Sequence, residues 1–349
     1  MENTQLSTQN IDTNASSSAF GWDFQSNAAI LFALKNIKDL VSLKVEGEIE
    51  DIEIYLKENK NIYIQAKSQE DPTPGTNTLT KLKDGLKTLI NATNQGNYDQ
   101  LIYVSNILNP LKNKSFDSYW GHTYALYFYD ELPPKAQDIV NKYKKIAAET
   151  YNLNLSNLDL STLQIGFFPF YGRDEDTRYR IISTYVKEFV IAAQASEGIA
   201  RDLLDYWQKV FFQNSTNRYV QLSKEELVWP LVILGSSVSA DDPFFEDYAL
   251  GQIDEIKRKY GHFINKKSEQ FEFVTEVISD FKDFSKENRH LRGKEAIPTF
   301  INNRWKCYDS RTNNELIDDE IKEGIIKLII LQILKNRFSI DNVKKAAGL

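Results

Sequence analysis

The chain has 349 residues and a formal net charge of −7, with 42% hydrophobic and 26% charged residues. This balance is typical of a soluble globular protein, and no apolar run approaches the roughly 20 residues that span a bilayer. One cysteine and three histidines exclude an internal disulfide and a structural zinc site. Because the first residues also lack the basic and apolar regions of a secretory signal, we expect a cytoplasmic protein without membrane contact.

The first predicted elements lie between residues 1 and 67. Residues 1–19 are mostly Ser, Thr, Asn and Gln, and we expect this segment to be disordered. A helix is predicted from Trp22 to Leu40, where apolar residues recur at helical spacing. Residues 51–56 and 62–67 then alternate polar and apolar side chains around a polar turn. This alternation predicts a β-hairpin.

Strands and helices alternate after the hairpin, and this order predicts an α/β sheet domain. From Thr177 onward the pattern is almost entirely helical, with a capping box from Ser223 to Glu226. Between the hairpin and Thr177, strands are predicted at 101–104, 124–129 and 163–168, and helices after an N-cap at Thr80 and from Pro133 to about Glu149; a long helix is predicted at 315–337, with its most apolar part at 325–334.

The polar segment 214–217 is the best candidate for a domain boundary. We therefore expect a sheet domain at 20–217 and a mainly α-helical domain at 218–349. The acidic balance of the chain argues against a protein that coats nucleic acid, because neutralising phosphates requires a basic surface. It leaves room for an enzyme that holds nucleic acid in one local basic groove.

The hairpin gathers polar side chains on one face. Side chains alternate along a strand, so Asp51 shares a face with Glu53, and Gln65 shares a face with Lys67. With the turn centred on Asn59, Asp51 is expected opposite Lys67, and Glu53 opposite Gln65. The apolar side chains of both strands then fall on the other face.

This set of side chains suits metal-dependent hydrolysis of a phosphodiester. Mg²⁺, or Mn²⁺ in its place, takes oxygen ligands such as the Asp51 carboxylate and the Gln65 carbonyl. The metal lowers the pKa of a bound water, and the Lys67 ammonium orients that water or stabilises the developing charge. The sequence leaves open whether one of the neighbouring acids Glu46, Glu48 and Glu50 assists.

The spacing D-x(13)-Q-x-K from Asp51 to Lys67 resembles the core of PD-(D/E)XK nucleases in its QxK variant, in which Gln65 stands where other members have an acid. With Gln25 in an early helix and Glu50 beside Asp51, the stretch is similar to the nuclease domain of CBASS effector endonucleases. The resemblance implies a restriction-endonuclease-like mixed sheet flanked by helices and a Mg²⁺-dependent endodeoxyribonuclease. The candidate catalytic residues are Gln25, Asp51, Glu53, Gln65 and Lys67, with Asp51 and Gln65 as metal ligands.

The helical second half resembles the nuclease subunit LmuA of Lamassu, or ABC-three-component, anti-phage systems. The residues that carry this resemblance are Trp229 with Pro230 and the segment 292–305. It implies a partner-binding domain that contacts an SMC-like ATPase and a small third subunit. Since the net field of an acidic monomer repels phosphates, and since cutting both strands of double-stranded DNA needs two sites, we expect self-association on activation.

Other interpretations of the same residues remain open. Asp51 and Lys67 also fit an ordinary cross-strand ion pair worth under about 1 kcal/mol. The lysines at 81, 83 and 87 fit either contacts to DNA phosphates or a solvated helix face. For the whole chain, the alternatives are a non-catalytic interaction subunit with a nuclease-like fold and a stand-alone restriction endonuclease. The three lysines that could contact DNA are Lys81, Lys83 and Lys87.

Overall fold

The computed structural model describes residues 16–95, 97–121, 123–217, 219–234, 242–246, 251–268, 270–312 and 319–349. The chain forms two compact units. Unit 1 contains the residues up to 32, 43–182 and 210–221, and unit 2 contains 33–42, 183–209 and 222–349. The sequence predicts a single passage between domains after residue 217, whereas the chain passes between the units several times. Residues 183–209, for example, precede the predicted boundary but belong to unit 2. A polar segment in the sequence gives no indication of such packing.

The sheet is mixed, with a parallel centre. Its strands are β1 (Leu40–Val45), β2 (Ile52–Leu56), β3 (Lys60–Lys67), β4 (Gln100–Ser105), β5 (Ala125–Phe128), β6 (Leu163–Phe167) and β7 (Leu222–Ser223). Within the described residues these seven strands are ordered β5-β6-β4-β3-β2-β1-β7. β3, β4 and β6 run parallel, while β2 and β5 pair antiparallel with their neighbours β3 and β6. The predicted mixed α/β sheet is therefore confirmed.

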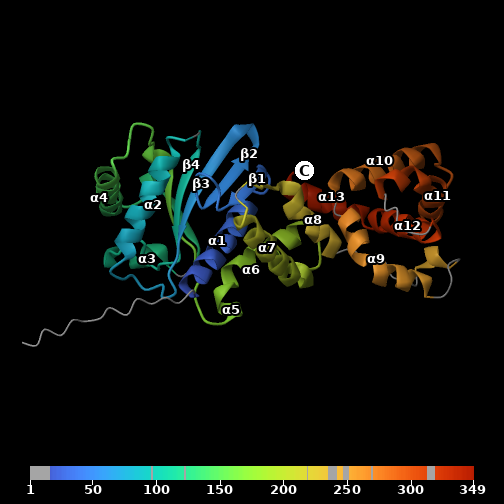
Figure 1. Cartoon of the computed structure of the whole chain (residues 1–349), viewed down its shortest axis with the longest axis horizontal. Helices are drawn as coiled ribbons and strands as arrows, with labels where there is room; N and C mark the ends of the chain where they lie inside the picture. Colours follow the sequence, from blue (N-terminus) through green and yellow to red (C-terminus); the bar gives the residue numbers. More distant parts are fainter. Residues whose placement is uncertain are drawn as a thin grey trace, which may run out of the picture. The chain divides into compact units, whose positions relative to one another are not determined.

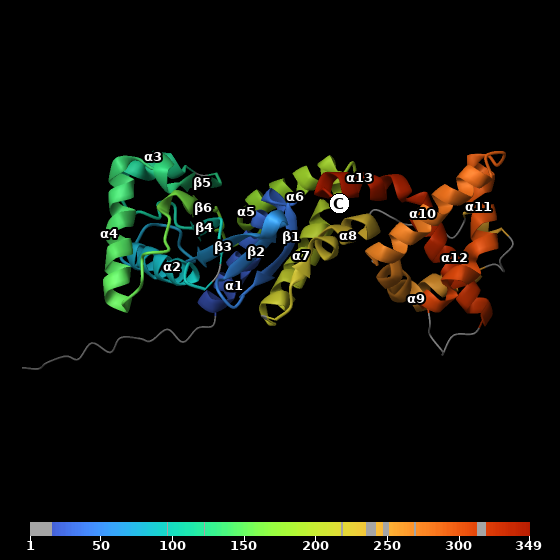
Figure 2. The ribbon, with the colours of Figure 1, turned by 90° about the horizontal axis from the view of Figure 1, so that it is seen from above.

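Helices flank the sheet and make up most of the second half of the chain (Figures 1 and 2). Of the described helices, none is long and apolar enough to cross a membrane. The predicted helical C-terminal region is confirmed. The helices are α1 (Ser16–Lys35), α2 (Thr78–Ala92), α3 (Asp117–Trp120), α4 (Pro134–Tyr151), α5 (Glu175–Arg178), α6 (Arg180–Ala192), α7 (Ala200–Ser215), α8 (Lys224–Leu234), α9 (Gln252–Ser268), α10 (Phe271–Glu287), α11 (Gly293–Arg304), α12 (Asp319–Lys335) and α13 (Arg337–Ala347).

Both faces of the sheet in unit 1 are covered. Figures 1 and 2 show α1 on one face and α2, followed by α4, on the other. Buried leucines of α2, among them Leu86, pack against Tyr63 of β3 and Tyr103 of β4. On the other face, Phe24 of α1 packs against Phe168, with ring centroids 5.7 Å apart. Because the α2 face is buried, the polar side chains that the hairpin directs toward it lie under a helix.

The N-terminal prediction needs correction. Of the predicted tail 1–19, residues 1–15 lie outside the described part of the chain, and the remainder forms the first turn of α1. The predicted helix 22–40 ends at Lys35, where a turn leads into β1; the Leu40 N–H donates to the Asn36 carbonyl at 2.8 Å. No glycine or proline marks this turn, so the helix-to-strand change gives no signal in the sequence.

One helix start differs from the predicted one, and another agrees. The N-cap position of α2 is Asn77 rather than Thr80. α12 is described from Asp319 to Lys335, and the predicted start at 315 lies outside the described residues; the apolar part of the helix, 325–334, is buried within unit 2. The capping box is confirmed, since the Ser223 N–H donates to Glu226 Oε2 at 2.8 Å and the Glu226 N–H to Ser223 Oγ at 3.1 Å.

Gly85 allows α2 to lie directly on the sheet. A Cβ at this position would stand 2.5 Å from a Tyr103 ring carbon and 3.4 Å from Gln65 Cγ. Intrinsic helix propensity favours Ala over Gly by about 1 kcal/mol. The close approach opposes this gain, because Tyr103 is fully buried and has no room to withdraw.

We therefore predict that Gly85→Ala lowers the free energy of unfolding by about 1–3 kcal/mol, the usual cost of overpacking a core. Urea denaturation measures the change. Gly75→Ala is the matched control, because the nearest atom to its added Cβ is 4.0 Å away, and it should change stability by less than about 0.5 kcal/mol. A Gly85→Ala protein as stable as the wild type would contradict this account of the packing.

Candidate active site

The register of the hairpin decides which polar groups meet. Glu53 lies opposite Tyr63, so the predicted register, with Asp51 opposite Lys67, is wrong by two residues. The turn centres on Glu58 rather than on Asn59, and both of these residues adopt positive φ. Because side chains alternate with a period of two, a shift by two residues preserves the predicted faces.

Asp51 is the centre of the site. Its Oδ2 accepts hydrogen bonds from the Gln65 side-chain amide and from the Ala66 N–H, the latter at 3.1 Å. The Gln25 side chain of α1 also bonds to this carboxylate, and Lys67 Nζ lies 3.8 Å from Oδ2. Burial raises the pKa of the Asp51 carboxyl, against the lowering effects of Lys67 and the hydrogen bonds. The structure thus brings together four of the predicted residues.

Glu50 is the most unusual group of this site. Its side chain is buried, with 5% of its surface exposed, and its Oε1 has no hydrogen-bond partner among the described residues. Burial raises the pKa of this carboxyl to about 8; the negative charge of Asp51 adds to the rise, and Thr88 and Lys67 oppose it. The signal that could have singled out Glu50 from the sequence is its place directly before Asp51.

Glu53 makes other contacts than those with the Asp51 cluster. Its Oε1 accepts from the backbone N–H groups of Ile49 at 2.6 Å and Glu50 at 3.3 Å, and its Oε2 accepts from the Tyr55 hydroxyl. Gly47 lies against the same carboxylate, where a Cβ would come within 2.2 Å of Oε1. Glu53 therefore holds the loop that presents Glu50.

Gln65 connects the cluster to α2. Its amide nitrogen faces Asp51, and its Oε1 accepts from the hydroxyl of Thr88. Gln65 is therefore available as a neutral metal ligand only after its amide has rotated about its last bond. The described residues contain no group of three or more His, Cys, Asp and Glu side chains that could hold a metal ion, so a cation here would depend on Asp51, Glu50 and ligands other than these four residue types.

The three lysines predicted as DNA contacts separate. Lys81 Nζ donates to the carbonyl of Ser68, directly after β3, and burial, with the nearby charge of Lys67, lowers the pKa of Lys81. Lys83 Nζ lies 3.6 Å from Asp84. Lys87 Nζ stands over the ring of Tyr151 in α4, 4.3 Å from its centroid. Only Lys81 among these three lies beside the cluster.

Comparison with known proteins gives a distant similarity of structure. No protein-family model matches the chain, and no curated protein matches it. A Cap4 SAVED/CARF-domain containing receptor of Moraxella osloensis is 12% identical with a TM-score of 0.35, over 61% of this chain and 47% of that one. The corresponding receptor of Acinetobacter baumannii, solved with the cyclic trinucleotide 3'3'3'-cAAA, is 12% identical with a TM-score of 0.37, over 73% and 59%. The chain spans about half the length of these receptors.

We predict that Glu50→Gln stabilises the metal-free protein at neutral pH. A folded-state pKa near 8 means that the folded protein binds more protons at Glu50 than the unfolded chain between about pH 4.5 and 8, so this residue makes stability fall as the pH rises through that window. Removing the titration should raise the free energy of unfolding at pH 7 by on the order of 1–3 kcal/mol.

Thermal unfolding in EDTA at pH 5 and pH 7 measures this effect. The gain should be larger at pH 7 than at pH 5. Glu48→Gln is the matched control, because Glu48 belongs to the same loop and is exposed, and it should change stability little at either pH. Equal stability of the wild type and Glu50→Gln at pH 7 would contradict the placement of Glu50 away from water.

Proposed function

We propose that this chain is a metal-dependent DNA endonuclease. The observation that carries the proposal is the buried Glu50 carboxyl, whose Oε1 is left without a partner among the described groups, directly beside Asp51. Burying a carboxyl oxygen without a hydrogen bond is costly, and a bound cation would offset that cost. Buried groups with strongly shifted pKa values occur often at functional sites.

The donor set fits Mg²⁺ or Mn²⁺. These ions take oxygen ligands, and Mg²⁺ commonly uses one or two carboxylates with waters and substrate phosphates. Asp51 and Glu50 would supply the carboxylates, and the Gln65 carbonyl, once its amide has rotated, would complete the protein ligands. The chemistry that a bound divalent cation supplies is charge neutralisation on the scissile phosphate and a lowered pKa of water.

The surrounding residues fit this role by position. The Lys67 ammonium is one-third exposed and 3.8 Å from Asp51, so it stands at the mouth of the cluster, where a phosphate oxygen would arrive. Gln25 and the Ala66 N–H hold the Asp51 carboxylate in place. Lys81 adds a second positive charge close to Lys67. Paired cations of this kind stabilise charge that develops on a phosphate during its displacement.

We predict that Asp51→Ala and Lys67→Ala each lower DNA cleavage by at least about 100-fold, the usual loss when one group that stabilises the transition state is removed. The assay is plasmid cleavage with Mg²⁺ or Mn²⁺, alongside circular dichroism to verify folding. Lys60→Ala, at the other end of β3 and exposed, is the control and should cleave like the wild type. Wild-type rates in both site variants would favour the non-catalytic interpretation of the fold.

We further propose that the chain is the effector subunit of a bacterial defence complex against phage or plasmid DNA. This finer proposal rests on the sequence resemblance to Lamassu nuclease subunits, and it places the SMC-like ATPase and the small third subunit on the helical second half. The net charge of −7 makes an isolated subunit a poor DNA binder. The resting complex would then be weakly active, and self-associated subunits would cut.

The prediction for assembly is that double-strand cleavage rises with the fraction of self-associated subunits. Mass photometry and plasmid cleavage, measured at the same set of protein concentrations, test this relation. Linear plasmid should form only at concentrations at which dimers or larger species are present. Full double-strand cutting by a strictly monomeric species would exclude gating by self-association and leave a stand-alone restriction endonuclease as the better description.

A further inference from the structure

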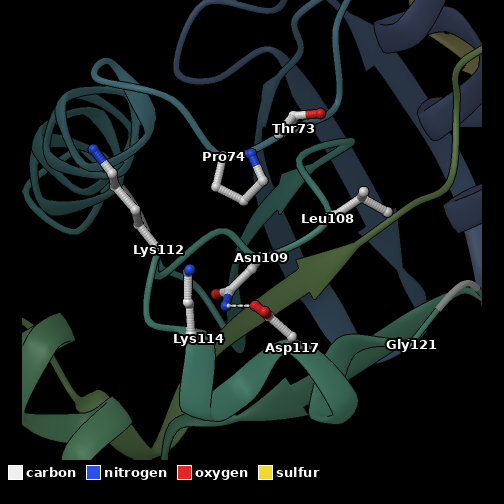
Figure 3. A pocket seen from close by; sticks show the side chains of 8 residues that line it. All are labelled: Thr73, Pro74, Leu108, Asn109, Lys112, Lys114, Asp117 and Gly121. Carbon is white, nitrogen blue, oxygen red and sulfur yellow. Dashed lines mark hydrogen bonds between the residues drawn. The ribbon is translucent and has the colours of Figure 1, made fainter.

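Unit 1 also contains a cavity of about 470 Å³ between the loops that follow β3 and β4. Thr73 and Pro74 come from the first loop, and Leu108, Asn109 and Lys112 from the second. Figure 3 shows Lys114 close to Asn109 and below Pro74, while the Lys112 side chain extends away from Pro74 toward a neighbouring helix. None of these residues belongs to the Glu50–Asp51 cluster.

The cavity lies at the same edge of the sheet as the cluster. β3 and β4 are parallel, and Lys67 at the end of β3 is the register partner of Ser105 at the end of β4. In parallel sheets, ligands bind outside the carboxyl ends of the strands. Both the cavity and the Lys67 ammonium are therefore reached from this edge.

Hydrogen bonds hold the two loops in fixed positions. The Asn106 side chain accepts from the Gln69 N–H at 2.9 Å and donates to the Gln69 carbonyl at 2.8 Å. The Leu108 N–H donates to the carbonyl of Pro72 at 2.9 Å. Since Gln69 follows Lys67 by two residues, these bonds join the two loops close to the end of β3 that carries Lys67. A ligand that occupies both would find them pre-organised.

The lining fits a phosphorylated nucleotide. Lys112 and Lys114 are exposed, and lysine ammonium groups bind phosphate as point charges. Asp117, the acid of the lining, accepts a hydrogen bond from Asn109 at 2.7 Å. Leu108 and Pro74 offer apolar surface to a sugar or a base. The volume is within the range of small-ligand pockets, roughly 300–1,000 Å³.

We propose that this cavity is a substrate subsite that takes a nucleotide of the DNA strand near the cleaved bond, with Lys112 and Lys114 each on one of the two phosphates that flank this nucleotide. The inference rests on the proposed nuclease function and extends it, because it assigns to this loop pair the role of holding the strand. Lys83 and Lys87 are engaged elsewhere by Asp84 and Tyr151. Lys112 and Lys114 would add further phosphate contacts beside the site.

The test compares two double variants of equal charge change. Lys112→Ala with Lys114→Ala removes the subsite, and Lys57→Ala with Lys60→Ala removes two exposed lysines at the opposite end of the hairpin. Binding of a duplex of about 30 base pairs is measured over a series of salt concentrations, in an Asp51→Asn background that prevents cleavage. Each lost phosphate contact should reduce the slope of log K against log salt by about 0.9.

We expect the subsite variant to lose a slope of about 2 and the control to keep the parent slope. In the cleaving protein, the subsite variant should raise KM severalfold and leave kcat within about twofold, because a binding contact made equally in both states lowers only KM. Circular dichroism shows whether each variant is folded. If the subsite variant unfolds, the single variants Lys112→Ala and Lys114→Ala replace it, each with an expected slope change of about 0.9.

The outcomes separate this inference from the proposed function. Cleavage by the wild type, together with an unchanged slope and KM in the subsite variant, would overturn the subsite and leave the nuclease. No binding and no cleavage by the wild type would overturn both. Saturable binding of a free nucleoside monophosphate that the subsite variant abolishes, with an unchanged DNA slope, would assign the cavity to a free nucleotide instead of the strand.

Discussion

The site depends on one constraint: the carboxyl groups of Glu50 and Asp51 are held next to each other and away from water. Glu50 and Asp51 are neighbours in the chain, and burial raises the pKa of both. Their repulsion and desolvation oppose folding, so the surrounding structure must hold them in place. Lys67 and the Ala66 N–H compensate for part of the Asp51 charge, whereas Glu50 keeps an oxygen without a partner in the described part of the chain.

The fold holds this buried pair in place from two directions. The Glu53 carboxylate gathers the N–H groups of Ile49 and Glu50 and so fixes the loop before β2. From the opposite side, Thr88 of α2 donates to the amide oxygen of Gln65. This contact requires α2 to lie close to β3, and Gly85 permits that approach. The packing of α2 and the position of the buried Glu53 carboxylate therefore determine the geometry of the site.

The local pattern predicts much of this arrangement, because alternation along a strand depends on nearest neighbours. The hairpin, the strands β4 and β6 and the shared face of Asp51, Gln65 and Lys67 follow from such patterns. The register does not, since it depends on the backbone conformation of two turn residues. Neither does the burial of Glu50, because the sequence contains no sign that α2 covers this face of the sheet. Local patterns also do not predict that the chain passes several times between the two units, or that residues 40–45 form the strand β1. Both features depend on contacts between segments that are far apart in the sequence.

Metal binding tests the central claim most directly. Mn²⁺, followed by electron paramagnetic resonance of the free ion, should bind saturably to the wild-type chain. Asp51→Ala and Glu50→Gln should each weaken this binding by at least about tenfold, since each removes an anionic ligand, while Glu48→Gln should bind like the wild type. Equal Mn²⁺ affinity in the wild type and in both site variants would contradict the assignment of this cluster as a cation site.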